Sequence, residues 1–557
     1  METMNRRKFL SYLGTGSVAL AAASSGLGVL TSEKAKAATA DHLFGFKTNK
    51  VSGYFKPIQH SKEDQLLLPK GFKYDVVAAY GDVINAAGDT FGFNNDYTAY
   101  FPLNGKNSDK GLLWVNHEYT NPIWVEGQPG SGGYTKEQLH KLLYNQGGSI
   151  IEVYRSQDGT WKLDKRSQYA RRITGLTPFE LTGPAKGSKA VGGVSKVQGT
   201  FANCSGGITL WNTVLSCEEN FESTAEAAGL NQTHYGWVIE VDPFHAEWQV
   251  RKHTALGRFH HENSAMGLAK DGRIVVYMGD DEKDACVYKY ISKGKFDAAK
   301  EKANSALLEE GTLYAANMKK GAWIALTIEA VQKALSAQGF KAPALISKTV
   351  EKLKAQFQTQ ADVLVYANEA ALILGATPTD RPEDVEISPF DNTIFIAHTN
   401  NDNHGNIHGH ITRFFEQDDD LGALEFDFEI FAAGGRQSGF SAPDNLSFDS
   451  NGNLWTVTDI SGSSINKGVH AHFGNNGLYV IPTIGPNAGE AMQFASAPLD
   501  AELTGPFFTP DETTLFLSVQ HPGEQTKDIK APTSMWPHRP GDSMPRPAVV
   551  AITGFKL

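Results

Sequence analysis

Acidic side chains and one cysteine recur at the two ends of short predicted hairpins, and they are the residues best suited to chemistry. Those that precede the first strand of a hairpin are Asp96, Cys204, Glu262, Glu383, Asp384, Asp444 and Asn445. Those that follow the second strand are His117, Glu118, Glu218, Glu219, Asp280 and Asp281. Carboxylate and amide oxygens favour hard cations such as calcium, whereas a thiolate favours a transition metal. The residue types therefore indicate a mixed metal site, if the fold brings them together.

These residues are carried by a hairpin that repeats along the chain. In the clearest unit, residues 444–449 lead through a turn at 450–453 into a second strand at 454–457. The same plan recurs in five other units, which start near residues 96, 204, 262, 383 and 505, with irregular spacing. Six divergent hairpins predict an all-β fold, a six-bladed β-propeller. A large β-sandwich or two separate domains is the alternative.

The propeller prediction gives the reason to expect a single site. In such a fold, the starts of the innermost strands and the loops that leave their partners converge at one end of the central channel. Carboxylates gathered there would raise one another's pKa, and their burial would be costly unless cations lay between them. Bound metal is therefore the expected resolution.

One long segment has the periodicity of helices instead of strands. Apolar residues recur at helical spacing at Ile324, Ile328, Val331 and Leu335, and again at Val350, Leu353 and Phe357. We expect a mainly helical insertion around residues 315–376, within a single domain that spans residues 38–557.

The N-terminal segment has the features of an export signal. Arg6 and Arg7 precede a mildly apolar stretch rich in alanine, glycine and serine, and residues 35–37 (AKA) are a plausible cleavage site. A basic amphipathic helix or a membrane anchor is the alternative, but the stretch is short for a bilayer span. We predict that residues 1–37 are a twin-arginine signal peptide, read by the twin-arginine translocase, and that the mature protein is periplasmic or secreted. No second hydrophobic span follows.

Composition excludes some functions. The 557 residues carry a formal net charge of −11, which argues against a nucleic-acid-binding surface. The three cysteines, Cys204, Cys217 and Cys286, fit no zinc or redox spacing and no disulfide framework. Neither a Gly-x-Ser-x-Gly elbow nor a phosphate-binding Walker loop is present, so a serine nucleophile or a nucleotide loop is not expected.

Six short motifs resemble those of the PhoX-type alkaline phosphatases, in the same order along the chain. They are residues 114–118 (WVNHE), 203–207 (NCSGG), 215–220 (LSCEEN), 381–384 (RPED), 443–446 (PDNL) and 518–524 (SVQHPGE). The resemblance implies an exported six-bladed propeller that holds a pair of ferric ions, several calcium ions and a bridging oxo group. It also implies hydrolysis of phosphate monoesters of small metabolites by a metal-bound oxygen nucleophile, for phosphate acquisition.

The resemblance also implies roles for particular residues. Arg381 is the expected phosphate-contacting residue, and Glu383 is expected to act with it in catalysis while binding metal. The implied metal ligands are Cys204, Glu218, Glu219, Glu262, Glu383, Asp384, Asp444 and Asn445. For Glu262 the alternative ligand is a neighbouring histidine, His260 or His261. Because adjacent residues of a strand point to opposite faces, Glu218 and Glu219 are not both expected to bind directly.

Two other functions remain open at this stage. A calcium-dependent propeller hydrolase of another class, a lactonase or a phosphodiesterase, would use carboxylates and asparagines but would have no use for Cys204 or Arg381. A non-enzymatic propeller would bind a protein or glycan and should present exposed aromatic residues instead of an acidic cavity.

Overall fold

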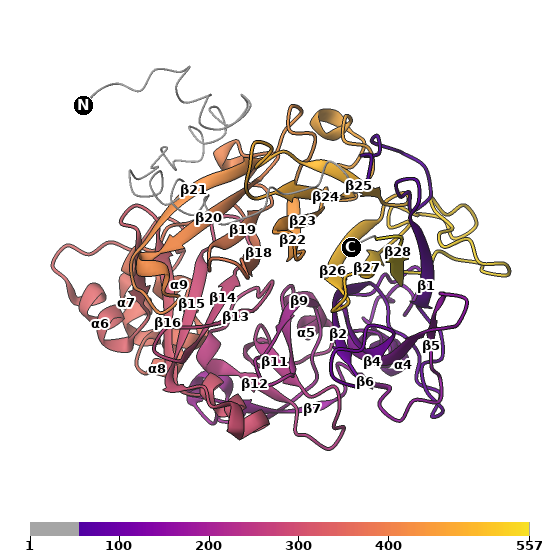
Figure 1. Ribbon diagram of the computed structural model, residues 1–557. Coiled ribbons are helices and arrows are strands. Elements are labelled where there is room, and N and C mark those ends of the chain that lie inside the picture. The colour runs from indigo at the N-terminus through magenta and orange to yellow at the C-terminus, as the bar shows by residue number, and fades with distance from the viewer. Residues whose placement is uncertain (1–54, 556–557) are drawn as a thin grey trace.

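The computed structural model describes residues 55–555, and the predicted signal peptide at residues 1–37 lies outside them. The described chain forms six sheets. Figure 1 shows these sheets arranged around a common centre, in a propeller-like fold. No helix in residues 55–555 is long and apolar enough to cross a membrane.

Each sheet begins at the centre with one of the predicted hairpins. In the order of their innermost strands along the chain, the first sheet contains β2 (Asn95–Pro102), β3 (Lys110–His117), β4 (Gly147–Arg155) and β5 (Trp161–Leu163), with β6 (Arg171–Ile173) paired to β4; the second contains β9 (Asn203–Ile208), β10 (Val214–Glu218), β11 (Val238–Val241), β12 (Arg251–His253), β7 (Pro178–Thr182) and β8 (Lys196–Gln198). The third contains β13 (Ala265–Leu268), β14 (Arg273–Gly279), β15 (Val287–Lys295), β16 (Gly311–Asn317) and β17 (Ala322–Ala325). Strand pairing is antiparallel except between β7 and β12.

The other three sheets have four strands each. They are β18 (Pro382–Ile387), β19 (Ile394–His398), β20 (His410–Glu416) and β21 (Phe426–Ala433); β22 (Pro443–Phe448), β23 (Asn453–Thr458), β24 (Gly477–Pro482) and β25 (Met492–Ser496); and β26 (Glu502–Phe508), β27 (Thr514–Gln520), β28 (Ala548–Thr553) and β1 (Lys73–Ala79). Because β1 near the N-terminus pairs with β28 near the C-terminus, this last sheet joins the two ends of the described chain.

The innermost strands form a closed ring of neighbours. In order, β2, β9, β13, β18, β22 and β26 each contact the next, and β26 contacts β2. Pairing within each of the six predicted hairpins is antiparallel. Apolar residues of successive sheets are buried against each other, as where Val385 and Ile396 of one sheet join Val275 and Tyr277 of the preceding one. The repeat seen in the sequence is therefore a real structural unit.

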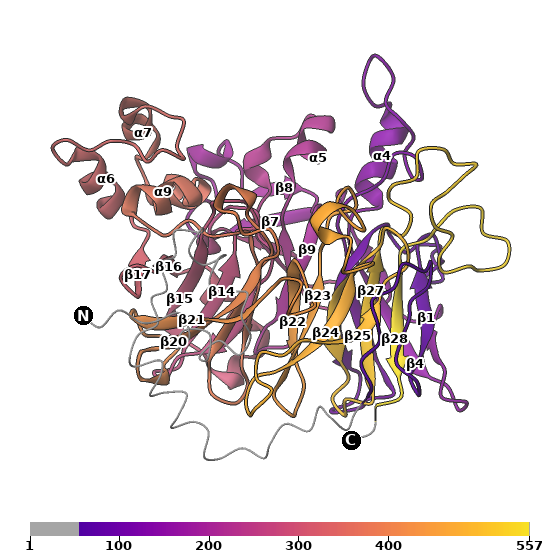
Figure 2. The ribbon, with the colours of Figure 1, turned by 90° about the horizontal axis from the view of Figure 1, so that it is seen from above.

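The α-helices of residues 55–555 are α4 (Lys136–Tyr144), α5 (Glu222–Ala227), α6 (Ile328–Ser336), α7 (Val350–Gln356), α8 (Gln360–Val365) and α9 (Ala367–Leu374). Figure 2 shows α4, α5, α6, α7 and α9 on one side of the sheets. The last four occupy the segment predicted to be helical. Thr327, Thr349 and Thr359 cap the N-termini of α6, α7 and α8 by accepting backbone hydrogen bonds. The predicted boundary at residue 315 was early, because residues 311–317 and 322–325 complete a sheet as β16 and β17. Ile324 accordingly lies in a strand, and its place in the helical pattern was coincidental.

Candidate metal centre

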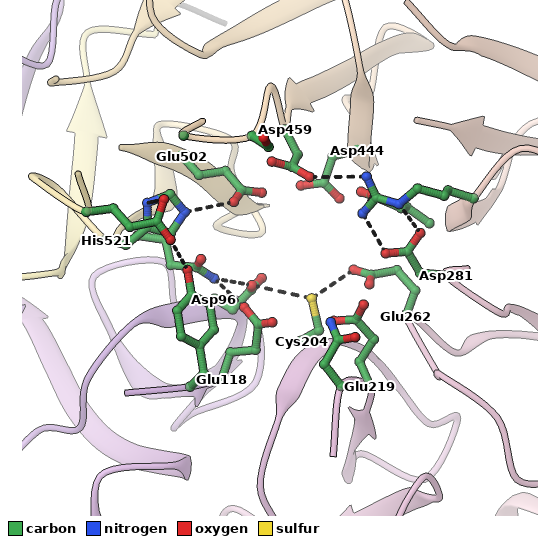
Figure 3. A pocket seen from close by; sticks show the side chains of 18 of the residues that line it. Asp96, Glu118, Cys204, Glu219, Glu262, Asp281, Asp444, Asp459, Glu502 and His521 are labelled. Carbon is green, nitrogen blue, oxygen red and sulfur yellow. Dashed lines mark hydrogen bonds and ion pairs between the residues drawn. The ribbon is translucent and has the colours of Figure 1, made fainter. Parts of the chain in front are cut away.

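A cavity of about 540 Å³ lies where the inner strands begin. Its acidic lining consists of Asp96, Glu118, Glu219, Glu262, Asp281, Glu383, Asp444, Asp459, Glu502 and Glu524. Cys204, Arg381 and His521 also line it. Figure 3 shows the labelled side chains among them arranged around one open centre. Residues that are more than 400 positions apart in the sequence, such as Asp96 and Glu502, thus share one site.

Of each pair of adjacent residues that was predicted to follow a second strand, only one lines the cavity. Glu118, Glu219 and Asp281 face the cavity, whereas the residues just before them do not line it. Those residues have other partners: His117 bonds Ser149, Glu218 bonds Lys252, and Asp280 bonds Asn368. Adjacent side chains of an extended chain point to opposite sides, which accounts for this alternation.

In the first strand of most hairpins, the pairing with the second strand is irregular at the residue that faces the cavity. In four hairpins the register shifts just where the cavity residue lies, at Asp96, Cys204, Glu383 and Asp444. A β-bulge bends the strand locally and re-aims a side chain, and such bulges are common beside active sites. Regular pairing would not turn these four side chains toward a single point.

A second backbone feature precedes the same residues. A non-glycine residue with positive φ stands two positions before each of five cavity residues: Asn94, Ala202, Arg381, Ala442 and Asp500, before Asp96, Cys204, Glu383, Asp444 and Glu502. The left-handed conformation costs a non-glycine residue about 1–2 kcal/mol. Strain of this kind persists where the surrounding structure over-determines it, often at functional sites. Its repetition in five sheets indicates a shared way of aiming side chains inward.

Cys204 lies between two groups of acidic residues. Its sulfur is within 4.8 Å of carboxylate oxygens of Asp96 and Glu118, and also within 4.8 Å of those of Glu219 and Glu262. The sulfur lies 3.2 Å from Glu262 Oε1 and 3.5 Å from Asp96 Oδ2, so its single S–H can donate to either carboxylate. Each of these two sets of three ligand atoms could hold a metal ion, and the two sets share the sulfur of Cys204.

The electrostatics of the cavity require positive charge. Ten carboxylate residues and one thiol face a single arginine and a single histidine among the lining residues. Burial, followed by neighbouring acids, raises the pKa of Glu262 and of Cys204 well above their usual values. Burial also raises the pKa of Glu118 to about 7. One oxygen of Asp96, Oδ1, is buried without a hydrogen-bond partner in the described chain. The residues present therefore fit cations.

Arg381 lies on one side of this acidic ring. Its Nε and Nη2 donate to the two carboxylate oxygens of Asp281 at 2.9 and 2.7 Å, and Nη2 is also 2.7 Å from Glu383 Oε1. Burial alone would lower the pKa of Arg381, but the carboxylates of Asp281 and Glu383 raise it, so the guanidinium stays charged. Its Nη1 is 3.6 Å from Asp459, beyond a good hydrogen bond, and so is open to an anion. Asp281 and Glu383 thus hold the arginine in place.

Several residues expected as ligands have different surroundings in the structure. Glu218 is not at the cavity: its carboxylate is 2.5 Å from Lys252 Nζ and accepts from the Trp237 backbone at 3.1 Å, with both charged side chains fully buried. We therefore remove Glu218 from the expected ligand set. The cause is the strand alternation that turns Glu219 inward.

Asp384 and Asn445 lie directly beneath the cavity lining and support it. Asp384 accepts from the side chain of Asn263 and from the Leu446 backbone at 2.8 Å, which links two neighbouring inner strands. Asn445 donates to Asp444 at 2.8 Å and lies 3.4 Å from Glu262 Oε1, while it accepts from the Gly505 backbone at 2.7 Å. Neither residue lines the cavity itself; Asn445 contacts two residues that do, Asp444 and Glu262.

The histidines beside Glu262 do not compete with it. His260 bonds Glu222 at 3.0 Å, and His261 is buried and bonds the Gly257 carbonyl at 2.8 Å. Of these three neighbours, only Glu262 lines the cavity. The PhoX resemblance was the reason to expect Glu262, instead of either histidine, as a ligand.

Asp459 and Glu502 line the cavity although sequence reasoning did not select them. Asp459 follows β23 as Glu118 follows β3, so the repeat itself carried the signal. Glu502 opens β26, three residues before Gly505, where the repeat had been aligned. His521 and Glu524 also reach the cavity, and His521 bonds Glu502 at 3.1 Å. The sixth hairpin was therefore aligned too late in the sequence to reveal its acid.

The adjacent acids Glu218 and Glu219 provide a direct test of this geometry. Glu219→Gln should lower bound metal and activity, because it removes a charge from the ligand group around Cys204. Glu218→Gln should instead destabilise the fold by about 3 kcal/mol, because Lys252 loses its buried counter-charge. Metal analysis and chemical denaturation of both variants separate the two effects. Equal metal loss in both would contradict the assignment.

The fold and the site together define a class, that of propeller-like proteins whose central acidic cavity is suited to cations. The chain matches the family described as alkaline phosphatase PhoX over residues 53–523. It is similar to the structure of Pseudomonas fluorescens PhoX in complex with vanadate, a transition-state analogue, with 32% identity and a TM-score of 0.75 over 90% of this chain and 98% of that one. The chain belongs to the PhoX family of alkaline phosphatases.

More distant structures are also similar. A gluconolactonase from Xanthomonas campestris matches with 12% identity and a TM-score of 0.31, over 86% of this chain and 97% of that one. At this level the likeness carries no argument about function. The comparison with curated proteins found no match. Membership of the PhoX family confirms the predicted class of enzyme, a metal-dependent phosphomonoesterase.

Proposed function

We propose that this phosphomonoesterase is a six-bladed propeller in which each sheet is one blade and the α6–α9 segment is an insertion. We further propose that its acidic cavity holds a pair of ferric ions and calcium, and that residues 1–37 direct it through the twin-arginine translocase to the periplasm or the exterior. The observation that carries the metal proposal is the pair of ligand groups that share Cys204, with Arg381 across the same cavity.

The proposed ligands divide by chemistry. Cys204 and Glu262 would hold iron, because a thiolate favours a transition metal. Glu219, Glu383 and Asp444 offer only carboxylate oxygens, which also suit calcium, and Asp96 and Glu118 join them on the other side of Cys204. When bound, such cations neutralise charge on a phosphoryl group and supply an activated oxygen nucleophile.

The protein's own residues would bind and orient the phosphate. Arg381 is held by Asp281 and Glu383, so its open Nη1 can donate to a phosphate oxygen without the entropy cost of ordering a free side chain. Gln520 donates to Asp96 at 2.6 Å and to Glu118 at 2.9 Å, which fixes these two carboxylates relative to each other. Asn445 does the same for Asp444 and Glu262 from below.

The proposal is tested by metal analysis combined with substrate comparison. The full chain is expressed with its N-terminal segment, and iron and calcium are measured in the purified protein. Hydrolysis of 4-nitrophenyl phosphate is compared with that of bis(4-nitrophenyl) phosphate, with and without added calcium. We expect bound iron, calcium-dependent activity, and at least a tenfold preference for the monoester. A protein that contains neither metal and prefers the diester would overturn the proposal.

A further inference from the structure

A second cavity, of about 700 Å³, adjoins the metal cavity. The two share Arg381, Asp459, Ser461 and Ser463 as lining residues. Arg381 therefore forms part of the boundary between them, with its guanidinium between the acidic ring and the neighbouring space. A molecule whose phosphate reaches Arg381 from the metal side would have the rest of its structure close to this second cavity.

Two loops contribute most of the residues that line the second cavity, one between β19 and β20 and the other between β23 and β24. The first contributes Ile407, and the second contributes Val469. These side chains are 40% and 54% exposed, so both offer apolar surface to a molecule in the cavity. The second loop also packs closely against the last sheet's loop at the cavity mouth, since a side chain at Gly462 would clash with Glu524. The loop between β23 and β24 thus borders both cavities.

Lys467 gives this second cavity a positive charge. Its Nζ donates to the Ser463 carbonyl at 3.0 Å, and it has no acidic partner among the described residues that line the cavity. The other lysine there, Lys283, is paired with Asp402 at 2.5 Å, and Arg381 is paired with the acids already described. Lys467 is therefore the cation that remains available to a ligand.

From these observations we propose that the second cavity binds the alcohol part of the substrate, and that the enzyme favours monoesters whose alcohol part is aromatic and carries a carboxylate. Ile407 and Val469 would contact the ring, and Lys467 would pair with the carboxylate. This inference rests on the proposed function of the metal cavity. It assigns substrate selection to residues that touch neither the phosphate nor the cations.

The test compares four monoesters: methyl phosphate, phenyl phosphate, 4-carboxyphenyl phosphate and 4-(aminomethyl)phenyl phosphate. Because kcat/KM is compared between variants for the same substrate, differences in leaving-group reactivity cancel. Lys467→Glu should lower kcat/KM for the carboxyphenyl ester by about tenfold through KM, since an attractive pair becomes a repulsive one. It should raise kcat/KM for the aminomethyl ester several-fold. A gain for one substrate cannot arise from a damaged loop.

The apolar contacts are tested separately. The double variant Ile407→Ser with Val469→Ser should lower kcat/KM for all three aryl esters by about fivefold, with a much smaller change for methyl phosphate, which is too short to reach the loops. Lys341→Glu, an exposed lysine in the helical segment, serves as the matched control for charge. Equal losses for every substrate, or no change for any aryl ester, would overturn the inference.

The outcome is separable from failure of the proposed function. Absence of methyl phosphate hydrolysis by the unsubstituted protein would count against the metal-cavity proposal. In that case, the proposed role of the second cavity can still be tested by calorimetry. The affinities of phenylphosphonate and 4-carboxyphenylphosphonate are measured for the unsubstituted protein and the same variants. Equal affinity of the two phosphonates for the unsubstituted protein would overturn it.

Discussion

Arg381→Ala should lower kcat/KM for 4-nitrophenyl phosphate by about 10²–10³-fold, the typical loss when one preorganised donor to a developing anion is removed. Two effects combine. The variant loses the open Nη1 donor, and it also removes the single arginine among the residues lining a cavity with ten carboxylate residues. An approaching phosphate dianion would then meet acids without a compensating fixed charge. Steady-state kinetics alongside metal analysis measure the effect.

Arg381→Lys is the matched control for this prediction. It keeps the charge but loses the planar fork that binds Asp281 through two nitrogens while leaving a third for phosphate. We expect an intermediate loss of about tenfold. Metal content should remain close to that of the unsubstituted protein in both variants, since Arg381 binds no cation. Activity within threefold of the unsubstituted protein in Arg381→Ala would show that the arginine does not contact the phosphate.

Removal of all cations should abolish activity and also make stability depend strongly on pH. In the cation-free fold, burial raises the pKa of Glu219, Glu262 and Glu502 well above the ordinary glutamate value, and that of Glu118 to about 7. Between the ordinary value of about 4.5 and the raised values, the folded protein binds protons that the unfolded chain has lost. Stability is therefore greatest at low pH within this range and falls as pH rises, by about 1.4 kcal/mol for each unit by which a pKa is raised.

Thermal melting of chelator-treated protein at pH 5 and pH 8 measures this dependence. The stripped protein should melt at a lower temperature at pH 8 than at pH 5, because more of the cavity acids must be ionised while buried. Restoring iron and calcium at pH 8 should recover both the melting temperature and the activity, whereas magnesium alone should recover neither in full. A stripped protein that is equally stable at the two pH values, or that keeps full activity, would refute a cation-filled cavity.

Sequence patterns anticipated the repeat and the site better than they anticipated which side chains would face it. The six hairpins were visible because each one alternates short apolar strands with polar turns, a local property of the chain. Asp96, Cys204, Glu262, Glu383 and Asp444 were found because they occupy equivalent places in the repeat. Asp459 holds such a place too, directly after β23, but was not among the predicted residues.

The type of chemistry could be predicted from local patterns alone: the repeated hairpin, the excess of acids beside it, the single thiol among them and the motifs that mark the PhoX family. Which member of each adjacent pair faces the metal cavity depends instead on the tertiary structure. There Glu218 forms an ion pair with Lys252, and Asp384 accepts a hydrogen bond from Asn263. The direction of a side chain depends on bulges and left-handed residues at the strand starts, which only the packing of six sheets around one centre can stabilise. The cavity beside Arg381 likewise exists because two loops some sixty residues apart in the chain meet in space.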